Sequence, residues 1–114
     1  MKRALIAIAA CAMLLSGCAP ATLYSWGRYQ AAAYSYAKSN TDEDAAKLGE
    51  AYRYVVSHPG GMRKVVPPGI YADYAYLLFR QGKTKEALEY LKMEIGLYPE
   101  STVFIGRIIK QLEK

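Results

Sequence analysis

Few side chains in this sequence could carry out chemistry. The chain has two cysteines, Cys11 and Cys18, and a single histidine, His58. Three adjacent carboxylates at residues 42–44 stand at the start of a predicted helix, where helix capping and the helix dipole explain them. An enzyme needs a nucleophile, a base or a cluster of metal ligands held together. We therefore predict a protein that is not an enzyme, with no metal, no cofactor and no small-molecule substrate; an enzyme is the remote alternative.

Cys18 is the one side chain for which the sequence indicates a specific chemical modification, because a signal-peptide-like segment precedes it. A basic start at Lys2 and Arg3 leads into twelve apolar residues, Ala4 to Leu15. Such a run is shorter than the roughly 20 residues that span a bilayer, and it is typical of the apolar region of a signal peptide. A buried cysteine in a core helix is the structural alternative for Cys18.

The residues that close this run, Leu15-Ser16-Gly17-Cys18, resemble a lipobox, the recognition sequence of bacterial lipoprotein processing. The resemblance implies that the signal peptidase recognises Leu15, Ser16 and Gly17. It also implies that the Cys18 thiol takes diacylglycerol as a thioether and becomes the mature N-terminus. Residues 1–17 are then a cleaved signal peptide and residues 18–22 a lipidated tether. Ala19 stands where aspartate would retain the protein in the inner membrane, which implies the periplasmic face of the outer membrane unless the organism sorts by other rules.

The composition of the expected mature chain limits its partners. Loss of Lys2 and Arg3 from the 15 basic residues leaves 13, against 10 acidic residues, a net charge of +3. This weak excess, on an exported chain, argues against nucleic acid as a partner. With Cys11 removed and Cys18 acylated, the mature chain has no pair of thiols for a disulfide.

Apolar residues in the remaining chain recur at helical steps of three and four. They predict a single all-α domain over residues 23–114, built from antiparallel helical hairpins of tetratricopeptide-like type. The first hairpin covers 23–57, a loop 58–68, the second hairpin 69–98, and a capping helix 101–113.

The first hairpin is predicted from local signals. Its first helix is expected over residues 30–38 with a start as early as Leu23, and its second starts at Thr41, which forms a capping-box-like start with Asp44. The aromatic run 23–29 either packs under the first helix or lies at the membrane interface, where Trp and Tyr are favoured. Whether this hairpin is a true repeat or a plain αα-hairpin is left open.

The second hairpin has clearer boundaries. Gly82 allows a left-handed end to its first helix, Thr84 is expected to cap its second helix, and Pro99 stops that helix. The spacing resembles a tetratricopeptide repeat, although any amphipathic hairpin is the alternative. Glu94 departs from the small residue usual in that repeat, which predicts looser packing against the next helix. The residues that match are Tyr71, Tyr74, Ala75, Leu78, Gly82, Ala87, Leu91 and Pro99.

Together with the lipobox, four short segments resemble a family of small proteobacterial outer-membrane lipoproteins of unknown function. The segments are residues 23–29, 66–69, 81–84 and 98–101. Members of that family are usually encoded beside a CsgG-like lipoprotein and a further small lipoprotein. The resemblance implies a shared envelope assembly, and it assigns no catalytic residue.

We therefore expect a protein–protein interaction module, because helical repeats form concave surfaces for peptides and partner helices. Tyr36 and Tyr76 are 40 residues apart, as are Pro59 and Pro99, which places the two tyrosines at equivalent positions of successive hairpins. A purely structural envelope lipoprotein, whose tyrosines only fill a small core, is the alternative. The predicted partner groove comprises Tyr29, Tyr36, Ala72, Tyr76, Phe79 and Arg80, with Ala32 on the matching face of the earlier helix.

Overall fold

The computed structural model describes residues 1–15 and 21–114, and within them every regular element is a helix. This confirms the predicted all-α fold class. Residues 16–20, which include Cys18 and parts of the predicted lipobox and tether, lie outside the described residues. The elements are α1 (Lys2–Leu15), α2 (Tyr29–Ser39), α3 (Asp42–Ser57), α4 (Ile70–Arg80), α5 (Thr84–Leu97), the 3-10 helix η1 (Pro99–Ser101) and α6 (Thr102–Leu112).

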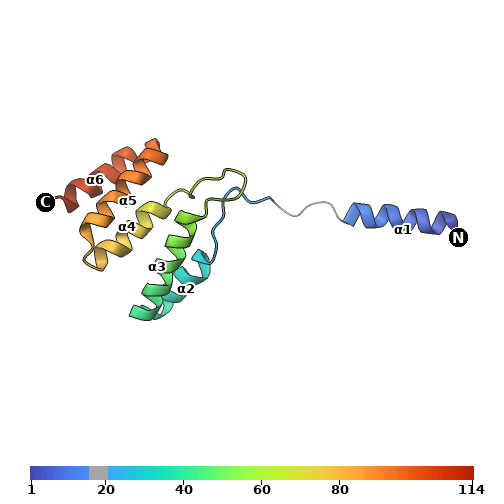
Figure 1. Cartoon of the computed structure of the whole chain (residues 1–114), viewed down its shortest axis with the longest axis horizontal. Coiled ribbons are helices and arrows are strands. Elements are labelled where there is room, and N and C mark those ends of the chain that lie inside the picture. Colours follow the sequence, from blue (N-terminus) through green and yellow to red (C-terminus); the bar gives the residue numbers. More distant parts are fainter. Residues whose placement is uncertain (16–20) are drawn as a thin grey trace.

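Helices α2 to α6 form one body in which each helix packs mainly on its neighbours in the chain (Figure 1). α2 pairs with α3, α3 with α4, α4 with α5, and α5 with α6. Helix α1 lies apart from this body in Figure 1. None of the described helices is long and apolar enough to cross a membrane.

Local signals set several helix ends as expected. Thr41 is the N-cap of α3, and its hydroxyl accepts a hydrogen bond from the backbone nitrogen of Asp44 at 3.2 Å. Helix α4 ends in a Schellman motif around Gly82, whose φ is +81°. In that motif Lys83 N donates to the Leu78 carbonyl and Gly82 N to the Phe79 carbonyl. The turn therefore satisfies carbonyl groups that the end of α4 would leave unpaired.

Two expected helix starts are wrong. Helix α2 begins at Tyr29 rather than near Leu23, because Gly27 takes a left-handed φ of +52° that a helix cannot continue through. Thr84 is not a cap: Lys83 holds the N-cap position of α5, and its carbonyl accepts from Ala87 N at 3.1 Å. Thr84 is therefore the first residue of the helix itself, one position past the cap.

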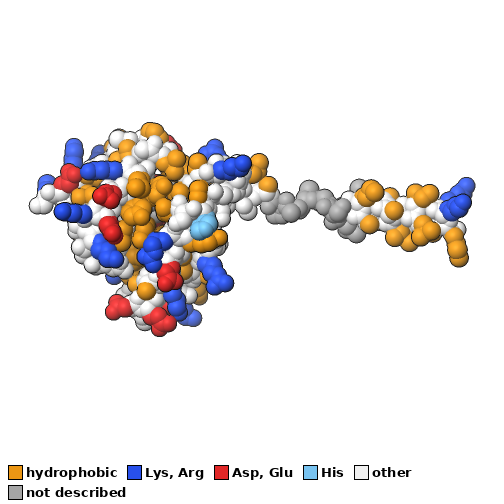
Figure 2. Space-filling model, in the orientation of Figure 1, with side chains coloured by type: hydrophobic (Ala, Val, Ile, Leu, Met, Phe, Trp, Pro, Cys, Tyr) orange, Lys and Arg blue, Asp and Glu red, His pale blue; other side chains and the backbone are white. Residues whose placement is uncertain are grey.

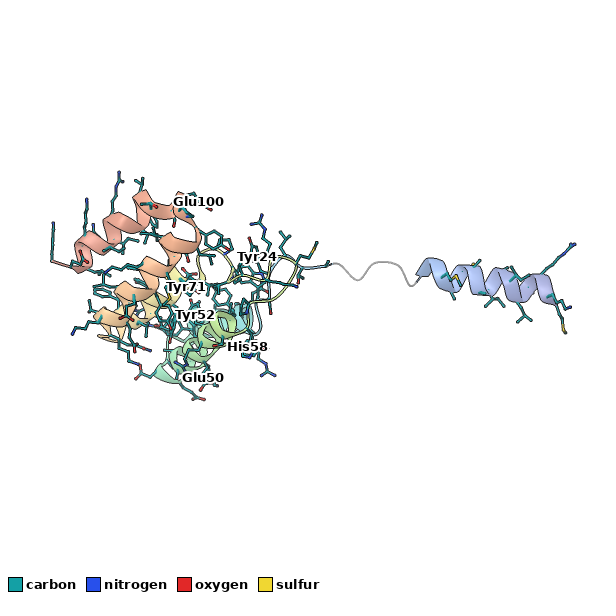
Figure 3. All side chains as sticks on the ribbon, turned by 45° about the horizontal axis from the view of Figure 1, so that its top comes forward. Tyr24, Glu50, Tyr52, His58, Tyr71 and Glu100 are labelled. Carbon is teal, nitrogen blue, oxygen red and sulfur yellow. The ribbon has the colours of Figure 1, made fainter. Side chains whose placement is uncertain are left out.

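The core is apolar and aromatic, and it runs through all the helices of the body. Seven aromatic rings follow one another across α2 to α5 and the segment before α2, with centroid distances of 4.7 to 6.2 Å. Figure 3 shows two of them, Tyr52 and Tyr71, inside the body. The aromatic run at 23–29 thus contributes packing, since Trp26 and Tyr29 lie against the core. The rings are Tyr24, Trp26, Tyr29, Tyr52, Tyr74, Tyr90 and Tyr71.

Glu94, which the sequence analysis expected to loosen the packing against the next helix, joins α5 to the start of the preceding helix, α4. The side chain is only 3% exposed, and its Oε1 accepts a hydrogen bond from Gly69 N at 2.7 Å. Gly69 is the N-cap of α4 and has no side chain to satisfy the start of that helix. Glu94 of α5 supplies the missing acceptor from outside the helix.

Candidate binding site

The guanidinium of Arg80 lies beside two tyrosine rings, one from each hairpin. Its central carbon is 5.9 Å from the ring centroid of Tyr36 on α2 and 5.9 Å from that of Tyr76 on α4. Such distances are within the range of cation–π attraction. The sequence analysis included Arg80 in the predicted partner groove, and the structure places it next to both rings.

Helix geometry explains how these residues meet. Tyr76 and Arg80 are four residues apart on α4, so they are neighbours on its surface. Tyr29 and Tyr36 on α2 are seven apart, as are Asp73 and Arg80 on α4, and this spacing also keeps residues on one face. Two contacts therefore follow one another along α2 and α4: the Tyr29 hydroxyl donates to Asp73 Oδ2 at 3.3 Å, and Tyr36 lies against Arg80.

The part of this face near the C-terminal end of α4 is accessible to solvent. Tyr76 is 64% exposed and Phe79 is 42% exposed, whereas Tyr36 is half-buried and packs against the core. We call Tyr36, Tyr76, Phe79 and Arg80 the Arg80 cluster. It borders a cavity of about 430 Å³ between the end of α2, the start of α3 and the end of α4. The cavity is lined by Tyr36, Asp42, Ala45, Ala46, Leu77, Arg80 and Gln81.

The charge of Arg80 is available to a ligand. In the part of the chain that the structure describes, the ion pairs join Lys47 to Glu43 and to Asp44, and none includes Arg80. Asp42 lines the same cavity without forming an ion pair with Arg80. A guanidinium between aromatic rings, with no carboxylate of its own, suits a carboxylate or an aromatic side chain of a partner.

The other predicted groove residues contribute to packing. The Tyr29 ring stacks at 5.9 Å from Trp26 and lies 5.3 Å from Tyr52. Burial raises the pKa of its hydroxyl, and the negative charge of Asp73 raises it further. Ala72 and Ala32 are half-buried against the core. The structure therefore brings Tyr36, Tyr76 and Arg80 together, and it places Tyr29 lower on the same face in a contact with Asp73.

Asp73 is the residue that the sequence analysis missed on this face. Burial raises the pKa of its carboxyl group, while the hydrogen bond from Tyr29 lowers it. Asp73 is seven residues before Arg80 on α4, as Tyr29 is seven residues before Tyr36 on α2. This shared spacing could have placed Asp73 on the same helix face as Arg80.

The single histidine of the sequence, His58, makes its contacts within its own helix. His58 is the C-cap of α3; its ring stacks on Tyr54 at 4.2 Å, and its Nδ1 donates to the Tyr54 carbonyl at 3.0 Å. No group of three or more metal-binding side chains occurs within residues 1–15 and 21–114. A second cavity, of about 670 Å³, opens between α2 and α3, and its charged lining includes Arg28, Lys47 and Glu50.

The fold and this face define a small helical-hairpin protein with an exposed aromatic and cationic surface. The sequence matches the family described as Domain of unknown function (DUF4810) over residues 23–108, and the chain belongs to that family. The match begins where the predicted tether ends and covers α2 to α5 and most of α6. Comparisons with curated proteins and with solved structures each gave no match.

Proposed function

We propose that this chain is a lipoprotein anchored in the outer membrane by acylated Cys18, and that its helical body is a non-catalytic protein–protein interaction module on the periplasmic side. The anchor rests on the resemblance of residues 15–18 to a lipobox. The chain joins the body at Thr22, four residues after Cys18, where its carbonyl accepts from Met62 N, so the body would stay close to the membrane.

The Arg80 cluster is the observation that carries the binding role. Tyr and Arg are enriched among the residues that dominate interface energies. Here an exposed tyrosine lies beside a guanidinium that has no carboxylate partner within the described chain, and Phe79, which precedes Arg80 on α4, is also exposed. A protein with an acidic or aromatic segment fits this surface.

The family resemblance suggests a partner. Its members are usually encoded beside a CsgG-like lipoprotein, so we propose a protein of that type in a shared envelope assembly. The neighbour-on-neighbour packing of α2 to α6 supports a tetratricopeptide-like arrangement. The alternative function is a purely structural envelope lipoprotein without a specific ligand, and an enzyme is the remote one.

The test compares Tyr76→Ala with wild type in two measurements, the melting temperature and the recovery of copurifying protein. We expect an unchanged melt, because Tyr76 is 64% exposed. We expect recovery of the partner to fall sharply, since truncating a hot-spot aromatic costs about 2 kcal/mol or more, roughly 30-fold in Kd. Tyr34→Ala is the matched control, since Tyr34 is 69% exposed on α2 and outside the cluster.

Three outcomes separate the possibilities. A normal melt with lost recovery in Tyr76→Ala alone supports the binding module. Lowered stability, or unchanged recovery, means that Tyr76 only packs and that the Arg80 cluster binds no protein. If crosslinking in cells captures no envelope protein beyond those captured by an unrelated lipoprotein, the structural alternative is favoured.

A further inference from the structure

The long loop between α3 and α4 is fastened to the first described residues of the body. Met62 N donates to the Thr22 carbonyl at 2.9 Å, and Arg63 N donates to the Leu23 carbonyl at 3.0 Å. Gly61 permits this approach, because a Cβ there would lie 2.6 Å from the Leu23 oxygen. The chain that leaves the tether and the tip of the loop are thus held side by side.

Apolar and basic side chains are exposed together at this place. Leu23 is 55% exposed and Met62 is 66% exposed, and the side chains of Arg63 and Lys64 beside them are also exposed. We call these four residues the loop tip. Figure 2 shows basic and hydrophobic atoms together where the body meets the grey segment.

The charged side chains in the chain segments around the loop tip are all basic. Residues 19–41 and 51–72 contain no Asp or Glu, whereas Arg28, Arg53, Arg63 and Lys64 all lie in these two segments. The loop tip therefore lies in chain segments that carry basic but no acidic side chains. Such a surface attracts an anionic one, most strongly within a Debye length of about 10 Å at 0.1 M salt.

The distance to the proposed anchor is short. Thr22, which accepts the bond from Met62, is four residues after Cys18, and four residues span at most about 14 Å when fully extended. Thr22 must then lie within that reach of the lipidated residue, and the backbone of Met62 lies one hydrogen bond beyond it. Exposed Leu and Met side chains next to Arg and Lys match the boundary between headgroups and acyl chains.

We infer that the loop tip docks on an anionic phospholipid surface, with Leu23 and Met62 among the lipid headgroups and Arg63 and Lys64 against phosphate. This inference rests on the proposed lipidation of Cys18, and it adds a second contact that orients the body. The Arg80 cluster is a separate surface, on α2 and α4, and remains available to a protein.

The test places an environment-sensitive fluorophore on the loop tip of the full lipoprotein. Met62→Cys supplies the only thiol of the mature chain, because Cys11 leaves with the signal peptide and Cys18 is acylated. The labelled protein is reconstituted into vesicles of phosphatidylethanolamine with phosphatidylglycerol, or with phosphatidylcholine instead. Lys110→Cys on α6 carries the control label.

We expect a blue-shifted emission and quenching by spin-labelled lipid for the label at residue 62, and neither for the label at residue 110. The shift should be larger with phosphatidylglycerol and should weaken in high salt. Lys64→Glu should reduce it, whereas Lys85→Glu, a charge reversal on α5, should leave it unchanged.

The outcomes separate this inference from the proposed function. A lipid-anchored protein whose label at residue 62 emits as in water overturns the docking of the loop tip alone. Equal shifts at residues 62 and 110 also overturn it, because the body would then have no preferred orientation. A chain that carries no lipid and stays off the vesicles contradicts both the anchor and the inference that rests on it.

Discussion

Glu94 shows how a single side chain can join two helices. Its carboxylate comes from α5, is almost fully buried, and accepts from Gly69 N at the start of α4. Burial raises the pKa of this carboxyl group above its usual value, while the hydrogen bond from the backbone of Gly69 lowers it; burial is the larger effect. The positive end of the α4 dipole favours the charge, but it does not offset the loss of water.

This balance predicts a pH dependence for Glu94→Gln. Because the folded chain binds the proton more tightly than the unfolded chain, Glu94 contributes most to stability below its usual pKa of 4.5. That contribution is lost as the pH rises through 4.5 toward the raised pKa of the folded state. Glutamine keeps the acceptor oxygen without the charge. The stability of Glu94→Gln relative to wild type should therefore increase from acidic pH to pH 7, as measured by urea unfolding.

Glu94→Ala is the comparison for this prediction. It removes the acceptor and leaves the Gly69 N–H unpaired, so it should cost about 1–3 kcal/mol. Asp73→Asn checks the neighbouring carboxyl group, whose pKa burial also raises. A stability difference between Glu94→Gln and wild type that does not change with pH would contradict the account.

At the scale of elements, the loop between α3 and α4 is held by contacts that depend on a glycine. Gly61 has a φ of +71°, and a Cβ on it would also lie 2.6 Å from Tyr24 N. On the other side of the loop, the Tyr98 hydroxyl donates to the Val66 carbonyl at 2.7 Å. Burial raises the pKa of Tyr98 to about 12, so this donor keeps its proton at neutral pH.

Gly61→Ala should therefore destabilise the protein by more than Gly82→Ala. Both glycines have a left-handed φ, which costs a residue with a Cβ about 1–2 kcal/mol. Only Gly61 also faces backbone atoms, since nothing lies within 4 Å of a Cβ built on Gly82. The melting temperatures of the two variants measure the difference. Equal effects would show that the close approach of the loop to residues 23–24 contributes nothing to stability.

At the scale of the whole molecule, most of the fold could be predicted from local chemistry. Thr41 with Asp44, Gly82 and Pro99 mark helix ends through contacts within a few residues, and the apolar spacing indicated the helices between them. Glu94 could not be interpreted in this way, because its partner Gly69 is 25 residues away. The hydrogen bonds of Thr22 with Met62 and of Leu23 with Arg63 also join residues that are far apart in the sequence.

The candidate site could be predicted only in part, because spacing in the sequence gives the helix face of a residue and not its contacts. The common 40-residue spacing placed Tyr36 and Tyr76 in equivalent positions, and the structure brings both to Arg80. Periodicity reports which face of a helix a residue occupies, but not how deeply that face is covered. It therefore included Tyr29 in the groove, although Tyr29 is packed between Trp26 and Tyr52.

In the proposed function, the position of the whole molecule depends on one residue, Cys18, which lies outside the described part of the chain. Three acyl chains on it would exceed the two signals that stable anchoring needs, at about 0.8 kcal/mol for each buried CH₂. Cells labelled with palmitate should therefore yield labelled wild-type protein in the outer-membrane fraction. Cys18→Ser should lose the label, whereas Cys11→Ser, which alters only the predicted signal peptide, should keep it. Unlabelled, soluble wild-type protein would show that the resemblance of residues 15–18 to a lipobox is accidental.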